Sequence, residues 1–237
     1  MAAWQASNNS FKPTPCRGIG HVLYATLAHV RRPDTGRLNS GVRPHKIMMT
    51  LYHLDVAGRL QEGMHINLSP GSLSWLGRTY TAKFRRYDVL KVLETGQLPA
   101  ELARLDPATF REFALEFLRL HYAPVKNLNR PSRLWSFFAT ESPDDAIRYA
   151  DRHEYHGEKR VFEVHTSGEH PCLDMTWLDR SFPNEISGGV LRHMQNYWAG
   201  ELFENHQQLG FEDTRGSLCE RLITSPITIG RIVQSAA

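Results

Sequence analysis

The sequence predicts one α+β domain that follows a basic N-terminal arm. The chain has 237 residues, of which 41% are hydrophobic and 22% charged. This composition supplies one sizeable core and argues against global disorder. Short β-rich segments recur along the body of the chain, and helical patterns fall between them without the regular βαβ alternation of a Rossmann fold. We therefore expect an α+β rather than an α/β architecture.

Residues 1–46 form the arm, which has little periodic pattern and many basic side chains. Two stretches, Asn9–Gly18 (NSFKPTPCRG) and Gly36–Val42 (GRLNSGV), resemble the translated repeat sequence that flanks integron gene cassettes. This resemblance implies an arm that is disordered or not native, with the genuine start at Met48 or Met49. An ordinary basic arm is the alternative, and on either interpretation we expect no chemistry there.

The body, residues 47–237, is expected to be a single domain that opens with two strands. Ile47–Leu54 (IMMTLYHL) is apolar and β-rich, and Gly63–Leu68 (GMHINL) alternates in polarity. Proline and glycine residues then predict a loop over Pro70–Tyr80. Tyr87–Leu93 has the pattern of a short helix.

The clearest helical pattern runs from Asp106 to Tyr122. Asp106 suits the N-cap position, and Pro107 suits the first helical position because the amide proton that proline lacks has no helical partner there. Phenylalanine, leucine and alanine side chains follow with helical spacing, and Pro124 stops the helix. We expect this apolar face to be core packing.

The second half of the body continues the mixture of strands and helices. Ser142 suits an N-cap, Pro143 the first helical position, and two aspartates follow at the positive helix end, which predicts a helix through Ala150. The other expected elements are a buried strand at Leu134–Ala139, a strand at Lys159–Thr166, an irregular stretch at Pro171–Asn184, a helix at Gly188–Trp198, and closing strands at Leu218–Ile223 and Ile227–Val233.

Several function classes are disfavoured by motifs that the sequence lacks. There is no GxSxG elbow, no GxxxxGK[ST] phosphate loop and no HExxH pattern, and Gly18-Ile-Gly20 does not complete a dinucleotide fingerprint. His153-Glu-Tyr-His156 fits a solvated polar turn better than a metal site. The net charge of +3 neither requires nor excludes a nucleic-acid partner.

The three cysteines, Cys16, Cys172 and Cys219, form no CxxC pair. An odd number without tight spacing argues against a disulfide framework and a structural zinc site, and it favours a reducing compartment. No apolar run approaches the roughly 20 residues of a membrane span, and the N-terminus lacks the pattern of a signal peptide. We expect a cytoplasmic protein with neither a metal nor a membrane partner.

The segment Trp135–Ala150 (WSFFATESPDDAIRYA) resembles the second signature of the ADP-ribosyltransferase superfamily, in which a strand ending in Tyr-Phe-Ala turns into a helix with a further tyrosine. The His-Tyr-Glu branch of that superfamily adds a histidine on an early strand and a glutamate on a late strand. His53 and Glu220 match these in order. Tyr197–Gly200 also resembles a Tyr-Trp-x-Gly element of an uncharacterised bacterial branch. The resemblance implies a split mixed or antiparallel sheet core with flanking helices.

The resemblance also implies roles for these residues in binding and cleaving NAD. Glu220 would be the catalytic carboxylate, which stabilises the oxocarbenium character of the ribose, with Glu201 as the alternative. His53 would hold the adenosine ribose, and backbone amides at Leu54 or His53 would read the nicotinamide carboxamide. Phe137 and Tyr149 would sandwich the nicotinamide ring.

The chain departs from the family pattern at Phe137, which stands where the family has tyrosine. A phenylalanine ring can still stack on the nicotinamide ring, but it cannot form the hydrogen bond of a tyrosine hydroxyl. The same residues also have ordinary structural interpretations: a strand histidine, core aromatics and a surface glutamate. It is their joint order along the chain that favours the transferase.

We therefore expect an NAD-dependent mono-ADP-ribosyltransferase, a glycosyltransferase acting on a protein, nucleic-acid or small-molecule acceptor. The resemblance would suit a toxin or defence protein, with an antitoxin or immunity protein as partner, and acceptor choice would lie on loops at Pro70–Tyr80 and Pro171–Ser187. One alternative is an NAD-dependent RNA 2′-phosphotransferase using a basic cluster. Another is a catalytically inactive binding module, or an unrelated α+β protein. The basic cluster would comprise Arg85, Arg86, Arg130 and Arg133.

Overall fold

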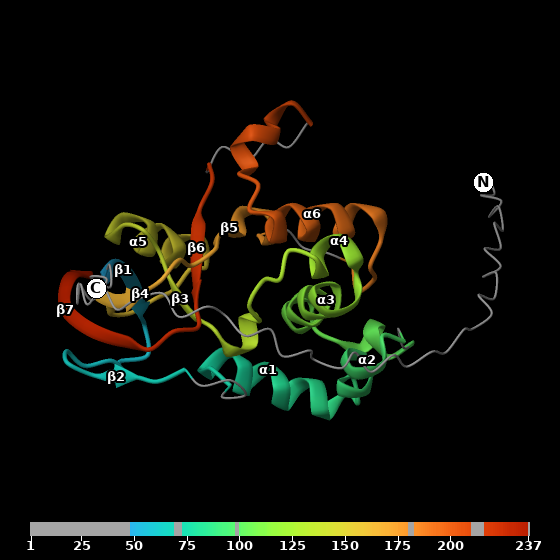
Figure 1. The fold of residues 1–237 in the computed structure, drawn as a ribbon, viewed down its shortest axis with the longest axis horizontal. Helices are drawn as coiled ribbons and strands as arrows, with labels where there is room; N and C mark the ends of the chain where they lie inside the picture. Colours follow the sequence, from blue (N-terminus) through green and yellow to red (C-terminus); the bar gives the residue numbers. More distant parts are fainter. Residues whose placement is uncertain (1–47, 69–72, 98–99, 180–182, 210–215, 237) are drawn as a thin grey trace, which may run out of the picture. The chain divides into compact units, whose positions relative to one another are not determined.

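The computed structural model of the chain describes residues 48–68, 73–97, 100–179, 183–209 and 216–236. All of them belong to one unit, Pro44–Ala237. The expected N-terminal arm over residues 1–46 therefore lies outside the described residues. Within the unit the fold is a mixture of helices and antiparallel strands, as the α+β prediction requires (Figure 1).

In the part of the chain that the structure describes, the strands form two antiparallel sheets. The first has four strands in the order β1-β4-β7-β2, and the second has three in the order β3-β6-β5. The strands are β1 (Met48–Asp55), β2 (His65–Ile66), β3 (Phe137–Ala139), β4 (Lys159–Ser167), β5 (Cys172–Asp174), β6 (Cys219–Ile223) and β7 (Ile227–Ala236).

Within the described residues, one isolated bridge joins the two sheets. The backbone N–H of Tyr52 in β1 donates to the carbonyl of Thr140 at 2.9 Å, and the N–H of Thr140 donates back at 2.7 Å. Thr140 directly follows β3. The sheets therefore meet where the outer strand of the first touches the end of β3.

Helices cover the outer faces of the sheets. Helix α5 packs on β1 and β4, while α6 contacts β5 and the long helix α3 (Figure 1). The α-helices are α1 (Trp75–Arg86), α2 (Leu90–Thr95), α3 (Pro107–His121), α4 (Ala123–Lys126), α5 (Pro143–Arg152) and α6 (Gly188–Ala199), and the 3-10 helices are η1 (Ala100–Arg104), η2 (Arg133–Trp135), η3 (Met175–Leu178) and η4 (Phe203–Leu209).

Both helix starts predicted from capping signals are confirmed. The Asp106 side chain accepts a hydrogen bond from the N–H of Thr109, and the Ser142 side chain accepts one from the N–H of Asp145. Each cap satisfies one of the N–H groups that a helix leaves without a partner in its first turn. The predicted helix over Gly188–Trp198 is also confirmed, as α6.

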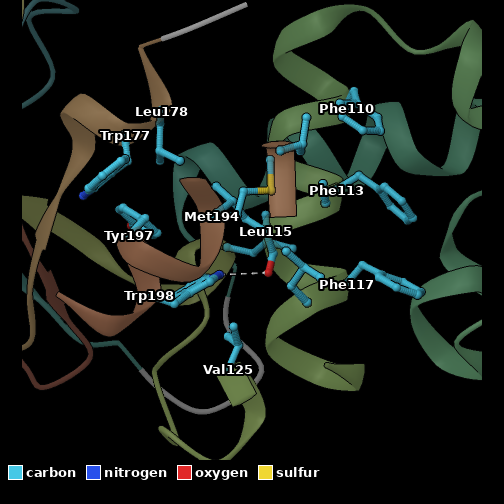
Figure 2. Close-up of a cluster of buried hydrophobic side chains, with 14 of the residues drawn as sticks. Phe110, Phe113, Leu115, Phe117, Val125, Trp177, Leu178, Met194, Tyr197 and Trp198 are labelled. Atoms are coloured by element: carbon cyan, nitrogen blue, oxygen red, sulfur yellow. Dashed lines mark hydrogen bonds between the residues drawn. The ribbon is translucent and has the colours of Figure 1, made fainter. Parts of the chain in front are cut away.

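The buried apolar side chains form two cores. The larger one lies among the helices and under the second sheet, where Trp198 and Leu115 are in the middle and the indole N–H of Trp198 donates to the Leu115 carbonyl at 3.2 Å (Figure 2). The smaller one lies between the two sheets, with Phe162 from the first and Ile223 from the second. Leu222, adjacent to Ile223, belongs to the larger core, so β6 contributes one face to each.

The loop expected over Pro70–Tyr80 is wrong from Trp75 onwards, because α1 begins there, while residues 70–72 lie outside the described residues. Ser74 caps this helix and also bonds the Leu134 carbonyl through its backbone N–H and its hydroxyl, each at 2.9 Å. Gly77 lies in the first turn, where a Cβ atom would be 1.9 Å from the same carbonyl oxygen. Gly77 thus permits close packing rather than breaking the helix.

Two further expectations are corrected by local structure. The strand expected over Leu134–Ala139 is confined to Phe137–Ala139, because the Ser132 hydroxyl accepts from the N–H of Leu134 and starts a short 3-10 helix. The stretch Pro171–Asn184, expected to be irregular, contains β5 and η3. Asp174 ends that strand by accepting from the N–H of Thr176 at 2.9 Å.

Candidate functional site

His53 and Phe137, two of the residues singled out from the sequence, are in direct contact. Their ring centroids are 4.3 Å apart, and His53 Nδ1 lies 2.6 Å from the carbonyl oxygen of Phe138. A carbonyl can only accept, so Nδ1 carries the proton. Nε2 of the neutral ring is then left as a hydrogen-bond acceptor.

The His53 ring is held in this neutral form. Burial lowers the pKa of His53 and outweighs the opposing effects of the Phe138 carbonyl and the Asp55 carboxylate. The side chain is nevertheless only partly buried. At neutral pH it therefore presents an uncharged acceptor of fixed tautomer beside the Phe137 ring.

Leu54 lies at the point where the two sheets separate. Continuing the register of the Tyr52–Thr140 bridge would pair Leu54 with Phe138, yet among the described residues the bridge goes no further. The Phe138 carbonyl instead accepts from the His53 side chain. The imidazole thus takes the place of a ladder hydrogen bond at this position.

The backbone of Leu54 faces the split between the sheets. Successive residues of a strand direct their N–H and C=O groups to opposite edges. Because Tyr52 directs its own groups to Thr140, Leu54, two residues later, directs its groups to the same edge, away from β4. A backbone donor and acceptor therefore lie next to His53 and Phe137.

The two phenylalanines of β3 face opposite cores. Phe137 pairs with Ile223 and packs against the smaller core, on the His53 side. Phe138 pairs with Leu222 and lies under the guanidinium of Arg133, whose carbon is 4.9 Å from the ring centroid. Phe137 is therefore the aromatic ring available at the split between the sheets.

Glu220, the expected catalytic carboxylate, is buried in an ion-pair network. It is 5% exposed, forms an ion pair with Arg133 and accepts from the Tyr197 hydroxyl at 2.5 Å. Glu220 shares a face of β6 with Leu222, whereas Ile223 and its partner Phe137 lie on the other face. The structure thus places Glu220 and Phe137 on opposite faces of the same sheet.

Arg133 links Glu220 to helix α3. Its Nε donates to Glu112 at 2.9 Å, and its backbone N–H donates to Glu116 at 2.9 Å. Burial by itself raises the pKa of Glu112, but Arg133 and Arg111 reverse this and hold it below its ordinary value. Burial likewise lowers the pKa of Arg133, and Glu112 and Glu220 together raise it well above its ordinary value. Glu112 and Arg133 therefore hold each other in their charged forms.

This network was not predicted from the sequence. Glu112 and Glu116 occupy the apolar pattern of α3 at a spacing of one helical turn, next to phenylalanines. Two glutamates within the apolar face of a helix indicate a buried cationic partner, because a charge without a partner is rarely buried. The sequence does not indicate which arginine supplies it.

Tyr149 lies on α5, and its ring packs at a tilt against the His153 ring, at a centroid distance of 4.5 Å. Among the described residues it makes no ring contact with Phe137. Burial raises the pKa of Tyr149 far above its ordinary value, with smaller effects from Tyr155 and Glu220. Its phenol is therefore a permanent hydrogen-bond donor, and Glu220 lies within its electrostatic reach.

The remaining candidates are dispersed. Glu201 is exposed after α6, with its carboxylate 3.6 Å from His206. Arg130 donates to the Trp198 carbonyl at 2.9 Å, and Arg133 is committed to buried carboxylates. The other two arginines of the expected basic cluster are exposed on α1. Among the described residues, these arginines are not gathered into a phosphate site.

Neither protein-family models nor curated protein sequences give a significant match to the chain. In the described part of the chain, no group of three or more histidine, cysteine, aspartate or glutamate side chains is arranged to hold a metal ion. No helix within the same residues has both the length and the apolar composition needed to cross a membrane.

Proposed function

We propose that the chain is an NAD-dependent mono-ADP-ribosyltransferase whose nicotinamide site lies at the split between the two sheets. One observation carries this proposal: the first strand and the Phe-Phe-Ala strand meet through the His53 side chain, with Phe137 against it. His53 and Phe137 are 84 residues apart in the sequence (137 − 53). Both lie in motifs that resemble those of the superfamily.

The fold supports the proposal at a coarser level. Two antiparallel sheets joined by one bridge, with helices on their outer faces, agree with the split-sheet core that the resemblance implies. Glu220 also lies on a late strand, and Tyr149 on the helix after β3, in the expected order. Fold likeness alone would leave the activity open, so the site has to carry the argument.

The chemistry of nicotinamide fits the groups at the split. A carboxamide needs one acceptor and one donor, and the Leu54 backbone offers both at the open edge of β1. Phe137 offers a flat ring for stacking, worth about 0.5–1.5 kcal/mol. His53 Nε2 offers an acceptor for a ribose hydroxyl. The acceptor of ADP-ribose, whether protein, nucleic acid or small molecule, is left open by these groups.

The catalytic carboxylate is the demanding part of the proposal. For Glu220 to stabilise an oxocarbenium-like ribose, it has to exchange part of its contact with Arg133 and Tyr197 for the ligand. Strand β6 also has to move, because Glu220 lies on the face of the sheet opposite to Phe137. A second candidate function, a catalytically inactive NAD-binding module, is favoured by this same burial and by the opposite orientation of Phe137. The two candidates share the binding site and differ in nicotinamide release.

Calorimetric titration of NAD into the purified protein tests the shared site. Phe137→Ala should weaken NAD binding by about tenfold, because it removes the stacking energy, while Phe137→Tyr should keep the affinity within a few fold. Both variants must first show the far-UV circular dichroism of the parent. An unchanged NAD affinity in Phe137→Ala would show that the ring only packs in the core, and it would contradict the proposed nicotinamide site.

A further inference from the structure

Cys172 and Cys219 face each other across the second sheet. Cys172 in the outer strand β5 pairs with Arg221, and Cys219 in β6 pairs with Asp174. Directly opposed residues share a face, and so do residues two apart on one strand, so both thiols are on the same face as diagonal neighbours. Both cysteines are free and partly exposed.

The two thiols lie close enough to interact, since each is the largest influence on the pKa of the other. A disulfide needs the sulfur atoms to approach to about 2.0 Å and the Cα atoms to lie at about 4.4–6.8 Å. Diagonal cross-strand neighbours have Cα atoms about 7–8 Å apart, so β5 and β6 must move towards each other to reach this geometry. The outer position of β5 leaves the strand free to make that movement.

The neighbours of the two thiols differ in charge. Arg221 opposes Cys172, and the buried carboxylate of Asp174 opposes Cys219. The interaction with the Cys219 thiol lowers the pKa of Cys172 against the effect of burial, and Arg221 acts in the same direction. The same interaction and burial raise the pKa of Cys219. Cys172 is therefore the attacking sulfur and Cys219 the resolving one.

We propose that Cys172 and Cys219 are a redox modification site that closes to an intramolecular disulfide with a low-molecular-weight disulfide such as oxidised glutathione. The Cys172 thiolate attacks one sulfur of the oxidant, forms a mixed disulfide and releases one thiolate. Cys219 then loses its proton and attacks Cys172, releasing the second thiol. Two protein thiols are oxidised, and one oxidant disulfide is reduced to two thiols that take up the protons.

This bond would link β5 to β6, the strand that carries Glu220 on its other face. The inference does not depend on the proposed transferase activity, because it rests on the register and the two thiols alone. Since a cross-link constrains the unfolded chain, the oxidised protein should unfold at a higher urea concentration than the reduced one.

The test uses the full chain with Cys16→Ser, so that only the pair is present. After incubation with oxidised glutathione, the folded protein should lose both titratable thiols and yield one peptide pair joining Cys172 to Cys219, both reversed by dithiothreitol. Two glutathione adducts, disulfide-linked dimers, or two thiols that persist until the protein is denatured would each overturn the proposal. This measurement requires no substitution within the pair.

Single variants test the order of attack. Cys219→Ser should trap one glutathione on Cys172, whereas Cys172→Ser should react about tenfold more slowly at Cys219, since the thiolate is the reacting form. Equal rates, or faster reaction at Cys219, would overturn the assignment of Cys172 as the attacking sulfur. Both rates are measured below the urea concentration at which each variant begins to unfold.

Discussion

Arg133 carries a buried positive charge between carboxylates from two distant elements. It is 4% exposed and pairs with Glu112 of α3 and Glu220 of β6. Replacing a whole buried ion pair by apolar groups is often tolerated, but removing one partner leaves a charge without compensation. The network is therefore a point where a single substitution should have a large effect on stability.

Arg133→Gln should lower the free energy of unfolding by about 3–5 kcal/mol, because Glu112 and Glu220 would remain buried without their cation. Arg231→Gln is the matched control: its ion pair with Glu163 spans 3.1 Å, but the arginine side chain is 72% exposed. The control should change the free energy by about 0.5 kcal/mol or less. Urea unfolding measures both, and similar losses would show that the buried network is not stabilising.

His53 should make stability depend on pH in the mildly acidic range. Its folded pKa is lowered from an ordinary value of 6.5, so the unfolded chain takes up the proton more readily. The contribution of His53 to the free energy of unfolding is fully present above pH 6.5. It is lost as the pH falls from 6.5 towards the pKa of the folded state. His170, whose pKa is lowered by burial and by Arg221, should add a loss of the same sign.

The variant His53→Asn separates the two histidines, because an asparagine amide can still donate to the Phe138 carbonyl but does not titrate. The free energy of unfolding of the parent should fall more steeply than that of His53→Asn between pH 7 and the folded pKa. Urea titrations at a series of pH values measure this difference. Parallel curves would mean that His53 is not held neutral by its surroundings.

At the scale of elements, the expected strands were mostly found, and the helices α1 and α4 were missed. Strand β1 was predictable from its apolar β-rich residues, and α3 from Asp106 and Pro107 at its start. Helix α1 was not, because Gly77 within its first turn suggests a loop when only local propensity is considered. Residue 77 is glycine because of a tertiary contact: the backbone at Leu134 approaches it too closely for any side chain.

Gly77→Ala should therefore destabilise the protein, by about 1–3 kcal/mol, although alanine favours helices. The new Cβ would meet the Leu134 carbonyl oxygen at 1.9 Å. Gly189→Ala is the matched control in the first turn of α6, where nothing lies within 4 Å of the added atom. This control should be neutral or stabilising by up to about 1 kcal/mol. If Gly77→Ala were also stabilising, the α1 packing described here would be wrong.

At the scale of the whole molecule, the two cores are connected by β3 and β6. Phe137 and Ile223 face the smaller core, and Phe138 and Leu222 face the larger one. The candidate nicotinamide site and the Glu220 network therefore lie on opposite faces of the same strands. Movement of β6 is the direct physical route by which one could affect the other.

Separation along the chain and strand register explain which features of the site could not be predicted from the sequence. The order of His53, Phe137 and Glu220 follows from short motifs, and the contact between the first two agrees with it. The partners of Glu220 do not follow from any motif, because Arg133 lies 87 residues away along the chain. Which face of β6 carries the carboxylate depends on a register that only the folded sheet reveals.

Nicotinamide release from NAD, followed by chromatography for the parent, Glu220→Gln and Glu201→Gln, tests the transferase proposal most directly. We expect release by the parent and by Glu201→Gln, and its near-complete loss in Glu220→Gln with NAD affinity kept within a few fold. Cooperative urea unfolding of Glu220→Gln must accompany the assay, since the substitution also alters the Arg133 pair. Binding of NAD without release by the parent would contradict the transferase and leave a binding module. Full release in Glu220→Gln would contradict the role of Glu220.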